Sequence, residues 1–233
     1  MAISAAVRDA ESVARSFESR TVWRPSGLSP AGLEPALTEA NLGFLERVAS
    51  RAAASPRQDT LPPSLLGLPA EYASRVLRLL PAERSRLAAA PFALFDLRFG
   101  DAAFWANVLG KSPQTSIGPN GPAAGRWARG ATVLAWHLAQ RGGLVAALTI
   151  GMTPAVQALW SGMPLSALES VASAAEEVLG ARWGSHPRFW NRMLTAVERD
   201  DSSGLHAVRH LGWQLLAADG LRPTLARRRL ARE

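Results

Sequence analysis

The strongest constraint on how this chain folds is an internal repeat with a period of about 84 residues. Glycine, proline and aromatic positions from residue 65 onward recur in the same order from residue 149 onward, at offsets that drift between 83 and 85. The matched positions are Gly67 and Gly151, Pro81 and Pro164, Arg98-Phe99 and Arg182-Trp183, and Phe104-Trp105 and Phe189-Trp190. Two copies of so long a unit do not make a solenoid. The pattern therefore predicts duplication of a small domain.

The residues between these landmarks are typical of helices. Ala, Leu and Arg abound, isoleucine is scarce, and no short run alternates in the way of a half-buried strand. With 48% hydrophobic and 19% charged residues, a chain of 233 residues can bury a sizeable core. We expect an all-α fold made of two similar small helical modules related by a pseudo-two-fold axis.

Proline and glycine divide the chain into parts. The stretch 110–125 holds four Gly and three Pro, which is typical of a linker. The expected parts are an N-terminal helix (4–19) and loop over 1–37, a first module over 38–109 that opens on a helix over 38–53, a linker over 110–129, and a second module with a basic C-terminal segment over 130–233.

Each copy contains a short helix, a turn and a further helix, over 153–178 in the second copy. We expect Thr153 to cap the first of these helices, and Pro154 suits its first turn. The helix after the turn carries no Lys or Arg and three glutamates, Glu169, Glu176 and Glu177. Because a recognition helix needs donors for phosphates and bases, this pair is a poor direct reader of DNA.

Five stretches of the second copy occur in an order that resembles a known family. They are LAQR (138–141), IGMTPAVQAL (150–159), MPLSALESVA (163–172), ARWGSH (181–186) and the C-terminal region from Gly204 onward. In this order they resemble FlhD, the smaller subunit of the bacterial flagellar master transcription activator. Residues 38–109 resemble the same family more weakly.

The resemblance implies an all-helical, DNA-associated transcriptional regulator that works with the zinc-binding subunit FlhC and recruits RNA polymerase. FlhD is a dimer of a chain roughly half this length, so the duplication is similar to two FlhD protomers fused into a pseudo-dimer. Two features depart from the family: there is no cysteine, and acidic Asp200 and Asp201 open the region that FlhD uses near DNA. The target genes need not be flagellar.

The resemblance also selects the candidate binding residues. They contact DNA or a partner protein in this interpretation, and they are His206, Arg209, His210, Arg222, Arg227, Arg228 and Arg229. Two histidines at i and i+4 can suit a metal, but no third ligand stands near them in the sequence, so no metal is predicted. The arginine-rich tail is equally compatible with an ordinary solvated terminus.

The net charge of +7 is concentrated at the C-terminal end. The segment from Arg222 to Glu233 carries five Arg and one Glu, or +4, and leaves only +3 for the rest of the chain. The absence of cysteine removes disulfides, thiolate metal sites and cysteine nucleophiles. No stretch is apolar enough for a membrane span or a secretory signal, so we expect a cytoplasmic protein.

No catalytic motif or cofactor loop stands out, so we expect a protein that is not an enzyme and holds no cofactor. Two hypotheses remain open. In the first, the chain regulates transcription with a FlhC-like partner on DNA. In the second, it is a helical protein-interaction scaffold that no longer contacts DNA. In both, Trp105 and Trp190 are expected to be buried anchors, and Arg98 and Arg182 to stack or cap.

Overall fold

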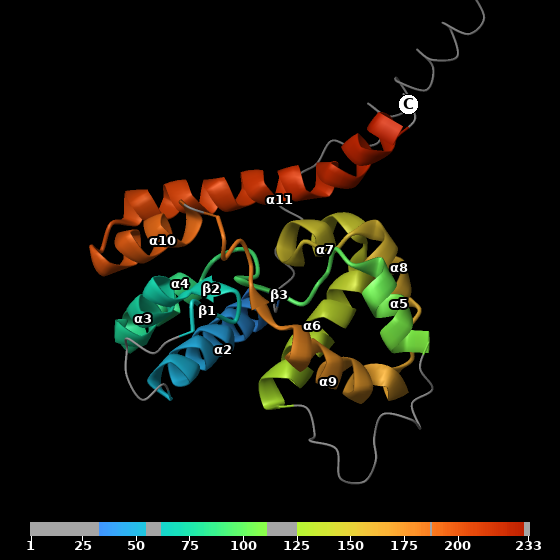
Figure 1. The fold of residues 1–233 in the computed structure, drawn as a ribbon, viewed down its shortest axis with the longest axis horizontal. Coiled ribbons are helices and arrows are strands. Elements are labelled where there is room, and N and C mark those ends of the chain that lie inside the picture. Colours follow the sequence, from blue (N-terminus) through green and yellow to red (C-terminus); the bar gives the residue numbers. More distant parts are fainter. Residues whose placement is uncertain (1–32, 55–61, 111–124, 187, 231–233) are drawn as a thin grey trace, which may run out of the picture. The chain divides into compact units, whose positions relative to one another are not determined.

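The computed structural model describes residues 33–54, 62–110, 125–186 and 188–230, with side chains as far as Asp219. The helix expected over 4–19 lies outside the described residues. Residues Leu33–Glu233 form one compact unit. The described residues of this unit are mostly helical, and each strand among them is two residues long, so the expectation of an all-α fold is confirmed (Figure 1).

The elements fall into two series, one before and one after residues 111–124. The first series is α2 (Leu33–Ala53), β1 (Ser64–Leu65), β2 (Leu68–Pro69), α3 (Ala70–Arg78), α4 (Pro81–Ala88), β3 (Phe95–Asp96) and α5 (Ala102–Gly110). The second series is α6 (Arg126–Arg141), α7 (Gly143–Ile150), α8 (Pro154–Ser161), the 3-10 turn η4 (Leu165–Ala167), α9 (Leu168–Val178), β4 (Gly180–Ala181), α10 (Phe189–Glu198) and α11 (Ser202–Leu230).

Helix α2 begins earlier than the sequence suggests. The expected start at residue 38 is wrong, because the helix already runs from Leu33 and includes Pro35 in its first turn. Proline is tolerated there since the first backbone N–H groups of a helix have no partner within it. Of the four residues that helical spacing predicts to form the buried stripe of α2, Leu45, Val48 and Ala49 are buried, whereas Leu42 is only half-buried.

Proline also opens α4 and α8, as the sequence predicts, with Pro81 and Pro154 at their starts. The expected cap by Thr153 is wrong. Its hydroxyl makes no bond to α8 and instead donates to the Phe99 carbonyl at 3.3 Å. The hydroxyl therefore ties α8 to the loop between β3 and α5.

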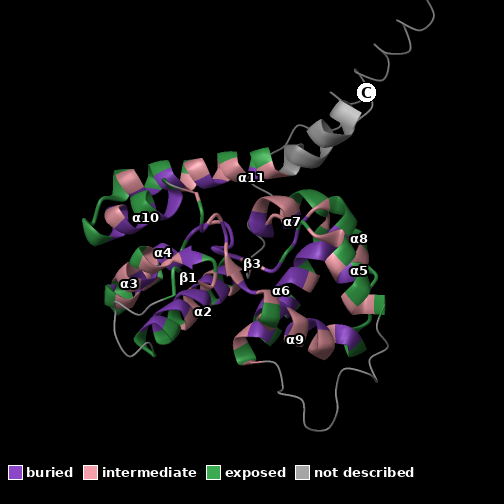
Figure 2. Ribbon diagram, viewed as in Figure 1, coloured by how far each residue is buried: buried purple, intermediate pink, exposed green. Residues whose placement is uncertain are grey.

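Two helices, α5 and α10, each pack against the other series, and we call them the exchanged helices; α10 also packs on α11 of its own series. Helix α5 packs on α8 and α9, while α10 packs on α3 and α4 (Figure 1). Strand β3 pairs antiparallel with β4, with Phe95 opposite Ala181 and Asp96 opposite Gly180. The two series thus share one hydrophobic core, and Figure 2 shows the buried positions on the inner sides of the helices.

The two exchanged helices are anchored by tryptophan, as expected. Trp105 and Trp190 are both 0% exposed. The indole of Trp105 packs edge-on to Trp160 with ring centroids 4.8 Å apart, and that of Trp190 lies 6.5 Å from Phe44. Each indole N–H also donates to a buried carbonyl, which removes the cost of an unpaired polar atom.

A buried amide fixes the chain between α4 and β3. Asn41 on α2 is 0% exposed and donates to the carbonyls of Ala88 and Phe92, each at 3.0 Å, while its oxygen accepts from Leu94 N–H at 2.8 Å. These hydrogen bonds satisfy backbone groups that have no partner in a strand. It holds β3 at the place where β4 meets it.

Among the described residues, no single helix is long and apolar enough to cross a membrane. Only α7 and α8 taken together pass the same test of length and composition, and they are bent by 113° at the break between them.

Candidate functional site

The predicted binding residues of α11 do not face the same way. His206 and His210 are exposed, and their Nε2 atoms lie 3.1 Å apart. Arg209 turns toward α4 instead, where its guanidinium donates to the Arg86 carbonyl at 3.4 Å and its buried Nε has no partner among the described residues. Burial, and then the charge of Arg86, lower the pKa of Arg209. The structure therefore brings the two histidines together and separates Arg209 from them.

The other predicted binding residues lie in the last part of α11. The backbone of this helix runs to Leu230, but the side chains of Arg222, Arg227, Arg228 and Arg229 lie outside the described residues. Their proposed contact with phosphates stays a prediction. Within the part of the chain that is described, no cluster of three metal-ligating side chains accompanies His206 and His210.

The two acidic residues that open this region have structural partners. Asp200 forms an ion pair with Arg86 on α4. The Asp201 carboxylate accepts from Gly204 N–H at 2.8 Å and so caps the first turn of α11. These contacts fix the corner between α10 and α11. They give the two carboxylates a structural role that could not be inferred from the sequence.

Two glutamates of α9 likewise form hydrogen bonds and ion pairs with neighbouring segments. Glu176 accepts from Gly125 N–H and from Arg47, each at 2.7 Å, and Glu169 pairs with Arg129 at 2.9 Å. Burial would raise the pKa of Glu176, but the two hydrogen bonds outweigh it and the pKa is lowered. Helix α9 therefore uses its carboxylates to hold α2 and α6.

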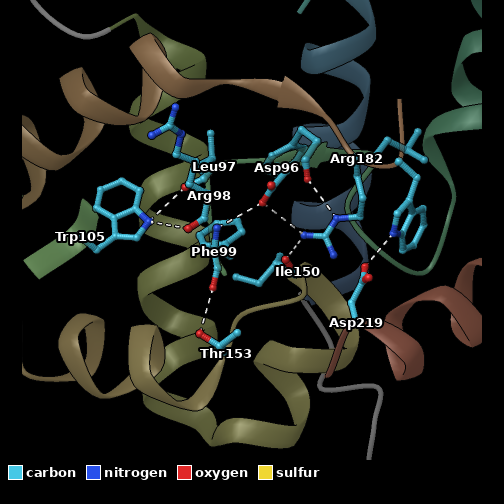
Figure 3. A network of polar contacts seen from close by, with 12 residues as sticks. Asp96, Leu97, Arg98, Phe99, Trp105, Ile150, Thr153, Arg182 and Asp219 are labelled. Atoms are coloured by element: carbon cyan, nitrogen blue, oxygen red, sulfur yellow. Dashed lines mark hydrogen bonds and ion pairs between the residues drawn. The ribbon is translucent and has the colours of Figure 1, made fainter. Parts of the chain in front are cut away.

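A buried arginine joins three segments at the centre of the unit (Figure 3). Arg182 is 6% exposed, and its guanidinium donates to the carbonyls of Phe95 and Ile150 and lies 3.9 Å from the Asp96 carboxylate. Ile150 ends α7, and a cation is favoured at the C-terminal end of a helix. The expected stacking of Arg182 on Trp183 is present, at 5.6 Å from the ring centroid.

A cavity of about 350 Å³ adjoins this arginine. Asp219 from α11 lines it and accepts from the Trp183 indole N–H at 2.9 Å (Figure 3). Burial lowers the pKa of Arg182, while Asp96 and Asp219 act in the opposite direction. Because the guanidinium is already balanced by these carboxylates and bound by carbonyls, we assign it the structural task of connecting β3, α7 and β4.

A wider groove of about 660 Å³ lies between α2 and α6. Within it Trp127 lies directly against Gly43, because a Cβ added at Gly43 would come within 3.1 Å of the indole nitrogen. The same nitrogen donates a hydrogen bond to the Ala40 carbonyl at 2.8 Å. Val133, 39% exposed, stands at its edge. The sequence gives no signal for this groove, because it depends on the pairing of two helices that are distant in the chain.

His186 has a local role at the edge of the core. Its Nδ1 accepts from the N–H of Phe189 at 3.2 Å, at the start of α10. Asp101 does the same at the start of α5, where it accepts from Phe104 N–H at 2.9 Å. Both exchanged helices thus begin at a side-chain cap.

No family model, curated protein or solved structure matches the chain.

Proposed function

We propose that Leu33–Glu233 is a fused pair of FlhD-like modules related by a pseudo-two-fold axis, and that the protein is a transcriptional regulator acting with a FlhC-like partner on promoter DNA. The observation that carries the proposal is the register of β3 and β4. At an offset of 85, Phe95 corresponds to Gly180 and Asp96 to Ala181. The observed pairs, Phe95 with Ala181 and Asp96 with Gly180, then exchange under a two-fold rotation.

The backbone on either side of these strands supports the same offset. Arg98 and Trp183 are both left-handed, with φ of 55° and 51°. In each copy the residue three positions later donates its N–H back to that carbonyl, at 2.9 Å for Asp101 and 2.8 Å for His186. Under this proposal the counterpart of Arg98 is Trp183, one residue after the match with Arg182 that the sequence suggests.

The exchange of α5 and α10 supports a pseudo-dimer in particular. In each copy a Phe-Trp helix packs on the short helices of the other series, and α10 packs on α11 as well. Trp105 donates to the Leu97 carbonyl at 3.1 Å and Trp190 to the Arg182 carbonyl at 2.8 Å, in both cases eight residues back. Isologous contacts of this kind are what fusion of a symmetric dimer would retain.

The link to DNA rests on the FlhD resemblance and on the charge of the C-terminal segment. His206 and His210 are accessible on α11, which continues as a helix toward Arg222. We expect the chain alone to bind DNA weakly and without sequence preference, since phosphate contacts position a protein but do not read bases. Sequence specificity would come from the FlhC-like partner, with recruitment of RNA polymerase by the complex.

The test compares the full chain with a chain that ends after Leu221, in salt titrations of DNA binding with and without the partner that co-purifies from the native host. Removing five Arg should lower the slope of log K against log salt by about 0.9 for each phosphate that is no longer bound. A full-length variant with Gln at Arg222, Arg227, Arg228 and Arg229 separates charge from length. Unchanged affinity and slope in both variants would refute DNA binding by the tail.

One observation favours the alternative of a protein-interaction scaffold. Arg209 is turned toward α4 and Arg86, so the described part of α11 presents His206 and His210 without the arginine that lies between them in sequence. If the full chain binds the partner but the complex does not retain DNA, the scaffold is the correct function.

A further inference from the structure

Three exposed arginines lie along α10, with Arg192 inside the helix and Arg188 and Arg199 at its N-cap and C-cap. Arg188, Arg192 and Arg199 are exposed, whereas the opposite side of the helix is buried (Figure 2). At 100° and 1.5 Å per residue, positions i, i+4 and i+11 fall within about 40° of one another and span about 16 Å along the axis. We call these three residues the α10 stripe.

The carboxylates beside the α10 stripe are already occupied. Glu198 accepts two hydrogen bonds from Arg75 on α3, at 2.9 and 2.7 Å. Asp200 pairs with Arg86, and Asp201 caps α11. Among the described residues, no ion pair is formed by the guanidinium groups of the stripe. Their charge is therefore available to a ligand.

The folding of α10 explains only Arg199, which stands at the C-cap, where the helix dipole favours a cation; it does not explain Arg188 or Arg192. Arg188 stands at the N-cap, where the helix dipole disfavours a cation. The helix with the matching role in the first series, α5, carries Ala103 and Asn107 at the positions that correspond to Arg188 and Arg192. Since α5 packs through its Phe-Trp pair without these charges, the stripe is an addition to one copy only.

We propose that the α10 stripe binds the phosphate backbone of nucleic acid. This inference rests on the proposed function and adds a contact surface that precedes α11. Guanidinium groups bind phosphate through paired hydrogen bonds and keep their charge at any physiological pH. The rise of about 6 Å between Arg188 and Arg192 is close to two base-pair steps of 3.4 Å measured along the duplex axis. A row of exposed cations on one helix face follows such a backbone.

The proposal specifies the kind of recognition. The amide and carboxylate side chains that stand between the arginines in sequence, Asn191 and Glu198, are both held by Arg75, so the stripe itself offers donors only and has no free group that could read a base edge. It would therefore bind duplex DNA independently of sequence and orient the protein on it.

The test uses the full chain and random-sequence duplex DNA in a salt titration. The variant R188Q/R192Q should lower the slope of log K against log salt by about 1.8, and affinity at 0.1 M salt should fall about 60-fold. Adding R199Q should lower the slope by a further ~0.9. The control R126Q/R141Q removes the same charge from exposed positions of α6 and should change the slope by less than about 0.5.

Exposed substitutions of this kind change stability little, so an unchanged thermal midpoint shows that the variants are folded. Equal slopes for the stripe and control variants would overturn the inference while leaving DNA binding by the chain, and with it the proposed function, in place. Loss of partner co-purification without any change in slope would show that the stripe is a protein-docking surface. If the unaltered chain binds no DNA, alone or with its partner, both proposals fail.

Discussion

Replacing Trp190 with Ala tests how the unit is held together. The side chain is 0% exposed, its ring lies 5.9 Å from Phe189 and 6.5 Å from Phe44, and its N–H donates to the Arg182 carbonyl at 2.8 Å. Truncating a buried Trp to Ala costs about 3–5 kcal/mol through reduced burial and the cavity that remains. Because α10 belongs to one series and packs on the other, this change should weaken the whole unit.

The assay is urea unfolding followed by far-UV circular dichroism. With an m-value of about 2–3 kcal/mol per molar urea, the midpoint should fall by about 1–2 M. Trp190→Phe keeps most of the apolar burial but leaves the Arg182 carbonyl unpaired, so it should cost about 1–3 kcal/mol. Trp105→Ala is the matched variant on α5 and should reduce stability by the same amount as Trp190→Ala. A midpoint change below about 0.3 M for both Ala variants would refute the shared core.

Two further predictions concern the backbone and pH. Gly151 has φ of 67°, and a Cβ there would lie 2.9 Å from Arg182 Cζ, so Gly151→Ala should lower the stability measured in thermal unfolding by about 1–3 kcal/mol. Gly130 lies inside α6 with open space around it, so Gly130→Ala should instead raise stability by about 0.5–1 kcal/mol. The opposite order of the two variants would contradict this geometry. Hydrogen bonds from Arg75 lower the pKa of Glu198 below its ordinary 4.5. The contribution of Glu198 to stability is therefore present above about pH 4.5 and is lost as pH falls below that value. Glu198→Gln should make the free energy of unfolding depend less on pH in the acid range. An unchanged dependence in that range would show that the pair of Arg75 and Glu198 does not stabilise the fold.

The sequence predicted the parts of the fold that depend on local pattern. Proline at the starts of α4 and α8 marks the first turn, because the missing N–H of Pro81 and Pro154 costs nothing there. The burial of Trp105 and Trp190 followed from helical spacing and from their match in the repeat. The start of α2 was placed too late, since a proline was taken as a boundary where the helix accepts it.

The features that could not be predicted depend on contacts between distant segments. Arg209 is turned away from solvent because it contacts α4, which lies more than 100 residues earlier in the sequence. Arg182 was expected to stack on its neighbour, and nothing in its sequence context shows that its guanidinium lies among the carbonyls of Phe95 and Ile150. Spacing along a helix gives the relative directions of side chains, but packing decides which direction is inside.

The exchange of α5 and α10 has a consequence for biosynthesis. The surface of α2, α3 and α4 that receives Trp190 is synthesised well before α10 leaves the ribosome, so it stays open through the intervening elongation. Expressed as separate polypeptides, residues 33–110 and 125–233 would each lack a helix that only the other supplies. The two fragments should therefore fold by complementing each other, and neither should give a cooperative unfolding transition by itself.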